Sequence, residues 1–131
     1  MPDRPRRAGQ KSFPPKGPLV MTHSVAQEDV DRIRLIMQAI AVRDEKTLSV
    51  LIDENREDMQ SVWEFIDSLY FAIATPMADF DQWTEIYPAE GGLGVDARFP
   101  TTDGEPSDLV VMLDIVTTVQ PHKFILKGIV T

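Results

Sequence analysis

The fold is decided by the stretch that runs from Leu109 to Val116 and reads Leu-Val-Val-Met-Leu-Asp-Ile-Val. All of its side chains except that of Asp114 are apolar, and four of the eight residues are β-branched. Strands that are covered on both faces read as near-continuous apolar runs of this kind, whereas half-exposed strands alternate. We therefore predict that residues 109–119 contain the central strand of a sheet.

Further strands are predicted on either side of this one. Residues 93–99 alternate between apolar positions and polar or glycine positions, which is the pattern of a half-buried strand. Residues 123–130 predict the last strand, and residues 80–87 predict either another strand or a short helix. The last strand is expected to place Phe124, Leu126 and Val130 on one face and Lys123, Ile125, Lys127 and Ile129 on the other. The connections are short, so the strands should form an antiparallel meander.

Before Pro76 the spacing of apolar residues is helical. The Ser24–Gln27 capping box should open a first helix, Asp44 should cap a short second one, and Asn55 or Asp58 a third. The third helix should stop at the proline. The inward stripes are Ala26, Val30, Ile33, Met37 and Ile40, then Leu48, Leu51 and Ile52, then Met59, Val62, Trp63, Ile66, Leu69, Tyr70 and Ile73.

These elements predict an α+β fold in which three N-terminal helices pack on one face of a three- or four-stranded antiparallel meander, within a single domain of residues 24–131. Residues 1–23 are predicted to be a disordered tail, because they hold five of the ten prolines and few large apolar side chains. The tail is basic. It is interpreted as a linker, or as an extension upstream of a start at Met21. The alternatives are an arm that contacts nucleic acid or an acidic partner, and a segment that folds back onto the domain.

Acidic side chains crowd the middle of the chain. Residues 57–108 carry twelve of them and one basic side chain, Arg98, so this run has a formal charge of −11, against −8 for all 131 residues. A domain with such a field repels nucleic acid and attracts basic proteins, at rates that depend on salt. The folded part is therefore not expected to bind nucleic acid.

Residue types that often carry catalysis or bind metals are scarce. The chain has no cysteine and two histidines, His23 in the tail and His122 beside a turn, where we expect an exposed side chain. Two isolated histidines do not predict a metal site or a catalytic triad. No apolar run approaches the roughly 20 residues that a membrane span needs. We predict no catalytic, cofactor-binding or metal-binding residues, and we expect Asp114 to pair with Lys123 or Lys127 across two strands.

The residues predicted to bind a partner are acidic or aromatic. They are Asp79, Asp81, Trp83, Glu85, Tyr87, Glu90, Asp103, Glu105 and Asp108. A second surface is expected on the sheet, because each helix has one strong apolar stripe and can cover only one sheet face. The uncovered face should hold Val110, Met112, Val116, Ile125 and Ile129, and it offers a place for two copies of the chain to join as a homodimer.

Helices followed by a curved antiparallel sheet, over residues 24–131, resemble the NTF2-like (cystatin-type) superfold. This resemblance implies a small-ligand binding protein, or an enzyme, with a pocket between the helices and the sheet. The stretch Ser107–Ile115 is also similar to the late strand of small bacterial α+β proteins, some of them immunity-like. That second resemblance implies a protein that binds and inhibits a toxin-like partner.

The charge and the lack of catalytic motifs favour binding over catalysis. We expect a non-enzymatic acidic protein-binding module, such as an inhibitor or immunity protein, that takes a basic protein partner. The NTF2-like ligand-binding protein or enzyme is the alternative. No cofactor and no membrane contact are expected. The absence of cysteine fits a reducing cytoplasm.

Overall fold

The sheet is built around β4 (Pro106–Val116), which contains the apolar stretch quoted above and lies in the middle of five strands. The computed structural model describes residues 25–76 and 83–131, so the predicted tail lies outside the described residues. The other elements are α1 (Gln27–Ala41), α2 (Glu45–Leu51), β1 (Glu54–Asn55), α3 (Met59–Asp67), β2 (Thr84–Ala89), β3 (Gly92–Pro100) and β5 (Lys123–Val130). The predicted α+β class, the three helices and the central strand are confirmed.

The sheet is mixed and not purely antiparallel, with the strand order β1-β5-β4-β3-β2. Strands β2 to β5 form an antiparallel meander. β1 adds a fifth strand, which lies between α2 and α3 in the sequence and runs parallel to β5. The amides of Asp53 and Arg56 hold it there by donating to carbonyls of β5 at 2.8 and 3.0 Å. The prediction of three or four antiparallel strands missed β1 because its two residues are exposed and show no apolar alternation.

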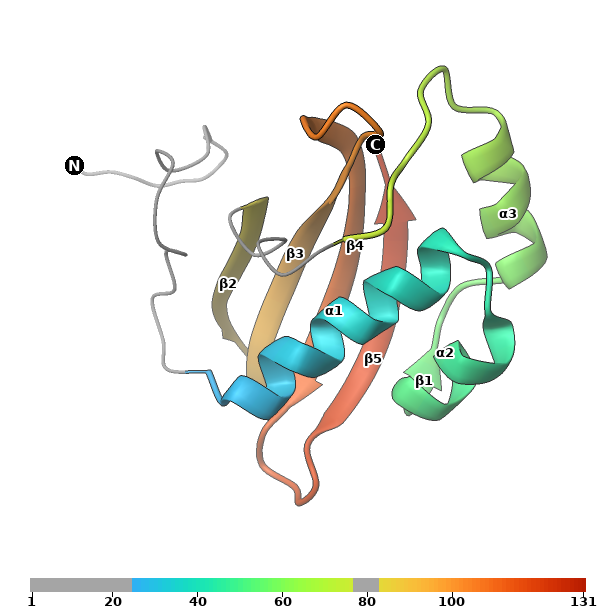
Figure 1. Cartoon of the computed structure of the whole chain (residues 1–131). Helices are drawn as coiled ribbons and strands as arrows, with labels where there is room; N and C mark the ends of the chain where they lie inside the picture. Colours follow the sequence, from blue (N-terminus) through green and yellow to red (C-terminus); the bar gives the residue numbers. More distant parts are fainter. Residues whose placement is uncertain (1–24, 77–82) are drawn as a thin grey trace.

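The first helix lies across one face of the sheet (Figure 1). Most of its predicted stripe is buried, with Ile33, Met37 and Ile40 each at most 1% exposed and Val30 partly buried, whereas Ala26 precedes the helix and is exposed. The next helix, α2, begins at the predicted cap, since the carboxylate of Asp44 accepts a hydrogen bond from the Thr47 amide at 3.1 Å. The residue that begins the predicted capping box of the first helix lies outside the described residues.

The third helix ends at Asp67 and does not continue to Pro76, so the prediction of its end was wrong. The residues after it pair with the end of β3 and the start of the loop that follows, and the Ala74 amide donates to the Pro100 carbonyl at 2.8 Å. These backbone bonds replace those that further helical turns would have made. Tyr70, predicted on the inward stripe, is 87% exposed. Figure 1 also shows α3 at the side of the sheet next to β5. The prediction had placed this helix over the face of the sheet.

The last strand carries one residue more than its partner. Leu126 and Gly128 pair with successive residues of β4, so Lys127 is the extra residue of a β-bulge. Beyond the bulge the two faces exchange. Ile129 is 7% exposed and lies on the helix side, whereas Val130 is 43% exposed on the other side. The predicted faces of these last two residues were therefore wrong, because strict alternation does not hold across a bulge.

The core lies between α1 and the face of the sheet that this helix covers. Side chains of β3, β4 and β5 that are at most 1% exposed fill this face: Val95, Ala97, Phe99, Leu109, Val111, Leu113, Ile115, Phe124 and Leu126. Removal of this apolar surface from water is the main force that holds the helix on the sheet. The opposite face of the sheet is consequently the one left for other contacts.

Candidate functional site

The sheet face that α1 does not cover carries carboxylates, a tyrosine and apolar side chains. The strand register defines it, because residues that pair directly share a face. Glu85 pairs with Asp96, and Asp96 pairs with Met112. The open face, as we call it, consists of Glu85, Tyr87, Asp96, Arg98, Asp108, Val110, Met112, Asp114, Val116, Lys123, Ile125, Lys127 and Val130. Four of the five apolar residues predicted on this face lie there; Ile129 does not.

A groove of about 530 Å³ lies on this open face. It is lined by Tyr70, Phe71, Asp96, Arg98, Asp108, Val110, Met112, Val130 and Thr131. The segment after α3 supplies one side of it. There the rings of Tyr70 and Phe71 meet edge to face with their centroids 5.0 Å apart, and the tyrosine hydroxyl donates to Asp108 at 3.3 Å. The tyrosine that the sequence placed in the core is therefore part of a surface groove.

Arg98 is the cation among the residues that line the groove. Its Nη1 donates to the Ser107 carbonyl at 2.8 Å and lies 3.7 Å from a carboxylate oxygen of Asp108. Burial lowers the pKa of Arg98, while the charges of Asp108 and Glu85 oppose that shift. The guanidinium is thus held by the protein's own oxygens, and it offsets part of the negative charge around it.

Tyr87 lies flat against the neighbouring strand. A Cβ atom at the paired residue, Gly94, would come within 2.3 Å of its ring, so only glycine leaves room for it. Its hydroxyl lies 3.2 Å from Asp96 and donates to that carboxylate. Burial raises the pKa of Tyr87 well above its usual value, and the charges of Asp96, Asp114 and Glu85 raise it further. Tyr87 is therefore a neutral hydrogen-bond donor, and the negative charges of three carboxylates help to keep it protonated.

Negative charge is concentrated at one end of the open face, where the groove meets the loop between β3 and β4. We call this the acidic end, and it comprises Glu85, Asp96 and Asp108 near Arg98, together with Asp103 and Glu105 of the loop. The side chains of Asp103 and Glu105 are exposed in the loop. Toward the other end the charges are balanced, since Asp114 forms the predicted cross-strand ion pair with Lys127 at 3.6 Å. A positively charged ligand would therefore be drawn to the groove end.

The structure brings some of the predicted partner-binding residues together and separates others. Glu85, Tyr87 and Asp108 lie on the open face, and Asp103 and Glu105 are exposed in the loop between β3 and β4. Of the remaining four, Glu90 lies at the opposite end of the sheet in the turn between β2 and β3, Trp83 is partly buried just before β2, and Asp79 and Asp81 lie outside the described residues.

Three residues of the site were missed as partner-binding candidates. Tyr70 was assigned to a helix stripe, Asp96 was noted only as a polar position in a half-buried strand, and Arg98 only as the lone cation of the acidic run. A signal for the last two was present. Both alternate with the apolar residues that face the core, so they had to point away from it.

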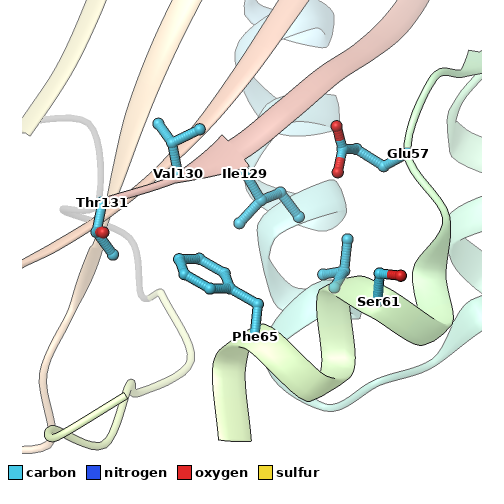
Figure 2. A pocket seen from close by; sticks show the side chains of 7 residues that line it. Glu57, Ser61, Phe65, Ile129, Val130 and Thr131 are labelled. Carbon is cyan, nitrogen blue, oxygen red and sulfur yellow. The ribbon is translucent and has the colours of Figure 1, made fainter. Parts of the chain in front are cut away.

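A second hollow, of about 440 Å³, lies between α3 and the end of β5 (Figure 2). It is lined by Glu57, Ser61, Val62, Phe65, Ile129, Val130 and Thr131. Figure 2 shows Phe65 reaching from the helix toward the strand, and Glu57 at the other end of the hollow. The lining is mainly apolar with one carboxylate, which does not assemble an acid–base pair or a nucleophile.

The prediction that His122 is exposed was wrong. Its ring Nδ1 lies 2.8 Å from a carboxylate oxygen of Asp29, which is buried in the first turn of α1. Beside this pair, Arg32 donates to the Leu51 carbonyl at 2.7 Å, and its guanidinium lies 4.5 Å from the centre of the Phe124 ring. These contacts join α1 to α2, to β5 and to the turn between β4 and β5, so we assign them a structural role.

No three His, Cys, Asp or Glu side chains lie close enough to hold a metal ion within the described parts of the chain. Among the same residues, no helix is long and apolar enough to cross a membrane. Comparison of the chain with protein-family models, with curated proteins and with solved structures gave no match. The functional interpretation therefore rests on the geometry of the open face.

Proposed function

We propose that this domain is a non-enzymatic, acidic protein-binding module that takes a basic protein partner at the acidic end of the open face. The observation that carries the proposal is the groove itself, whose lining combines the carboxylates of Asp96 and Asp108 with the apolar side chains of Val110 and Met112 and the exposed ring of Tyr70. Such a surface suits a partner with lysine or arginine side chains around an apolar contact, since aromatic rings and carboxylates both attract cations.

The charge of the domain supports this proposal in a second way. Long-range attraction raises the rate at which a basic partner finds the site, and salt weakens that attraction. The same charge repels the phosphates of nucleic acid. An inhibitor or immunity protein that neutralises a basic toxin-like partner would use such a surface. A cytoplasmic location remains a prediction that rests on the absence of cysteine.

Binding of an octa-arginine peptide, followed by fluorescence anisotropy at low salt, tests the proposal. The variant Asp103→Asn/Glu105→Gln removes two charges from the acidic end, and Glu28→Gln/Glu64→Gln removes two exposed charges from the helices. We expect the first variant to weaken binding several-fold more than the second, because it changes the local site and not only the net charge. Equal losses for the two variants would show that the peptide senses net charge alone and would overturn the proposal.

The alternative of a ligand pocket between helices and sheet receives less support. The described side chains in that interior, such as Val95, Leu109 and Phe124, have no exposed surface and belong to one core cluster. An NTF2-like protein or enzyme would place its ligand there. Titration with a panel of small apolar probes, monitored by shifts of core methyl signals, tests this alternative.

A homodimer through the open face is a second candidate. The apolar side chains of Val110, Met112 and Val130 favour it, and the exposed valine in particular would gain from being covered. The carboxylates of two copies would repel each other unless each acidic end met the opposite end of its partner. Sedimentation equilibrium at high protein concentration measures this directly, and a purely monomeric result there contradicts the homodimer.

A further inference from the structure

We propose that the hollow between α3 and β5 binds a small primary amine with an apolar body, such as an arylalkylamine. The hollow shares only Val130 and Thr131 with the groove on the open face, so the proposal goes beyond the function proposed above and does not depend on it. Its volume of about 440 Å³ lies within the range of pockets that hold small ligands.

The apolar wall of the hollow belongs to the packed core of the domain. Val62 of α3 and Ile129 of β5 are 3% and 7% exposed, and Phe65 packs against the same core cluster. Figure 2 shows the Phe65 ring reaching from the helix toward the strand. Because these side chains stand on a helix and a strand, the wall is already formed before a ligand arrives. An apolar group placed against it would be removed from water, which favours binding.

The other end of the hollow is formed by Glu57 (Figure 2). Its amide donates to the side-chain oxygen of Asn55 at 2.8 Å, which holds the backbone at this point. A Cβ atom placed on Gly128 would lie 3.7 Å from one carboxylate oxygen of Glu57 and 3.6 Å from the methyl carbon of Met112. The carboxylate is therefore held beside β5 and is partly buried.

The charge of Glu57 has no cation beside it in the part of the chain that the structure describes. The guanidinium of the next residue along the chain, Arg56, donates to Glu54 at 2.7 Å. On β5, the ammonium group of Lys127 lies 3.6 Å from Asp114. No ion pair of Glu57 is found among the described residues. A positively charged ligand group therefore complements this end of the hollow.

The first turn of α3 adds a second oxygen to the lining, that of Ser61. The serine hydroxyl donates to Asp58 at 2.8 Å, so its lone pairs remain for a donor from the ligand. A primary ammonium group has three N–H donors, so it can bind a carboxylate and still donate to a hydroxyl or to water. The start of a helix carries a partial positive charge, which the carboxylates of Glu57 and Asp58 offset here. The lining thus calls for a ligand with one positive charge at one end and an apolar group at the other.

Titration of the isotope-labelled protein with phenethylamine at low salt, followed by amide chemical shifts, tests the proposal. Phenethyl alcohol is the neutral probe of the same shape. We expect the amine to bind with a dissociation constant of about 1 mM, because the ligand is small, and to shift signals around Phe65 and Ile129. It should bind about fivefold more tightly than the alcohol, the effect of one partly exposed ion pair. Absence of binding, or shifts confined to the groove around Tyr70 and Met112, would overturn the proposal.

Replacement of Glu57 separates the effect of its charge from that of the apolar wall. Glu57→Gln keeps the shape of the side chain and should make the two probes bind equally. The matched control Glu64→Gln removes the same charge from an exposed position of α3 and should keep the fivefold preference for the amine. If Glu57→Gln keeps that preference, or if both variants lose it to the same extent, the carboxylate of Glu57 does not hold the amine and the proposal is refuted.

Discussion

Replacement of Gly94 by alanine should destabilise the protein through a single side chain, that of Tyr87. The new Cβ atom would lie 2.3 and 2.5 Å from two carbon atoms of the tyrosine ring, which is closer than such atoms can approach. The ring must therefore swing away from β3. It would then lose both its contact with the strand and its hydrogen bond to Asp96.

The expected cost follows from these two losses. Exposing one face of a tyrosine ring uncovers about 80 Å² and costs about 2 kcal/mol. The hydrogen bond contributes about 1 kcal/mol, and alanine recovers about 0.7 kcal/mol relative to glycine within a strand. The net destabilisation should be about 2 kcal/mol.

Two other glycines provide a scale for this value. At Gly92 a Cβ atom would lie 1.9 Å from the backbone carbonyl oxygen of Ile115, which cannot turn aside, so Gly92→Ala should cost more than Gly94→Ala. At Gly104 a Cβ atom would meet nothing within 4 Å, but φ is +84°, so Gly104→Ala should cost only about 1 kcal/mol of backbone strain.

Urea denaturation followed by tryptophan fluorescence measures these differences, and a double-mutant cycle identifies their cause. In a Tyr87→Ala background the obstacle at residue 94 is gone, so Gly94→Ala should become neutral or slightly stabilising. If Gly94→Ala costs the same in both backgrounds, the ring contact is not the cause and the reasoning is refuted.

Three further outcomes are expected from denaturation experiments. Because burial and nearby carboxylates raise the pKa of Tyr87, the folded state holds the phenol proton more tightly, so stability should fall as the pH rises above about 10, and should fall less in Tyr87→Phe. Hydrogen bonds from Thr47 lower the pKa of Asp44, so the stability difference between the protein and Asp44→Ala should be present at neutral pH and vanish as the pH falls below about 4. Ile129→Ala should cost about 2–4 kcal/mol because the residue is buried on the helix side, and Ile125→Ala on the open face should cost clearly less. Equal costs for the two isoleucines would contradict the bulge.

The sequence predicted the elements of the fold better than their arrangement. The apolar run that ends at Val116 and the period of the first helix depend on local patterns of burial, and both predictions were confirmed. β1 and the end of α3 depend instead on partners far away in the chain. The backbone amides of Asp53 and Ala74 donate to residues more than twenty positions away in the chain, and no local sequence pattern predicts such hydrogen bonds.

The candidate site was predicted only in part, and the reason is the same: its residues meet through contacts between distant parts of the chain. The excess of acidic residues is visible in the composition, but the run divides in the structure between α3, the loops and the open face. Only the strand register shows that Glu85 and Asp96 lie side by side. The register of two strands depends on the length of the turn and on which face is buried. The sequence could therefore indicate that these residues point away from the core, but not which of them lie opposite each other.

The bulge at Lys127 explains how the open face acquired its groove. In a regular strand Val130 would point into the core, and Ile129 would stand on the open face opposite Val110. The larger isoleucine would then fill much of the space that the groove now occupies. With the extra residue, the isoleucine packs beside α3 and the smaller valine lines the groove. A single irregularity in β5 thus anchors the third helix on one side of the sheet and opens the proposed binding site on the other, which fits the frequent occurrence of bulges next to functional sites.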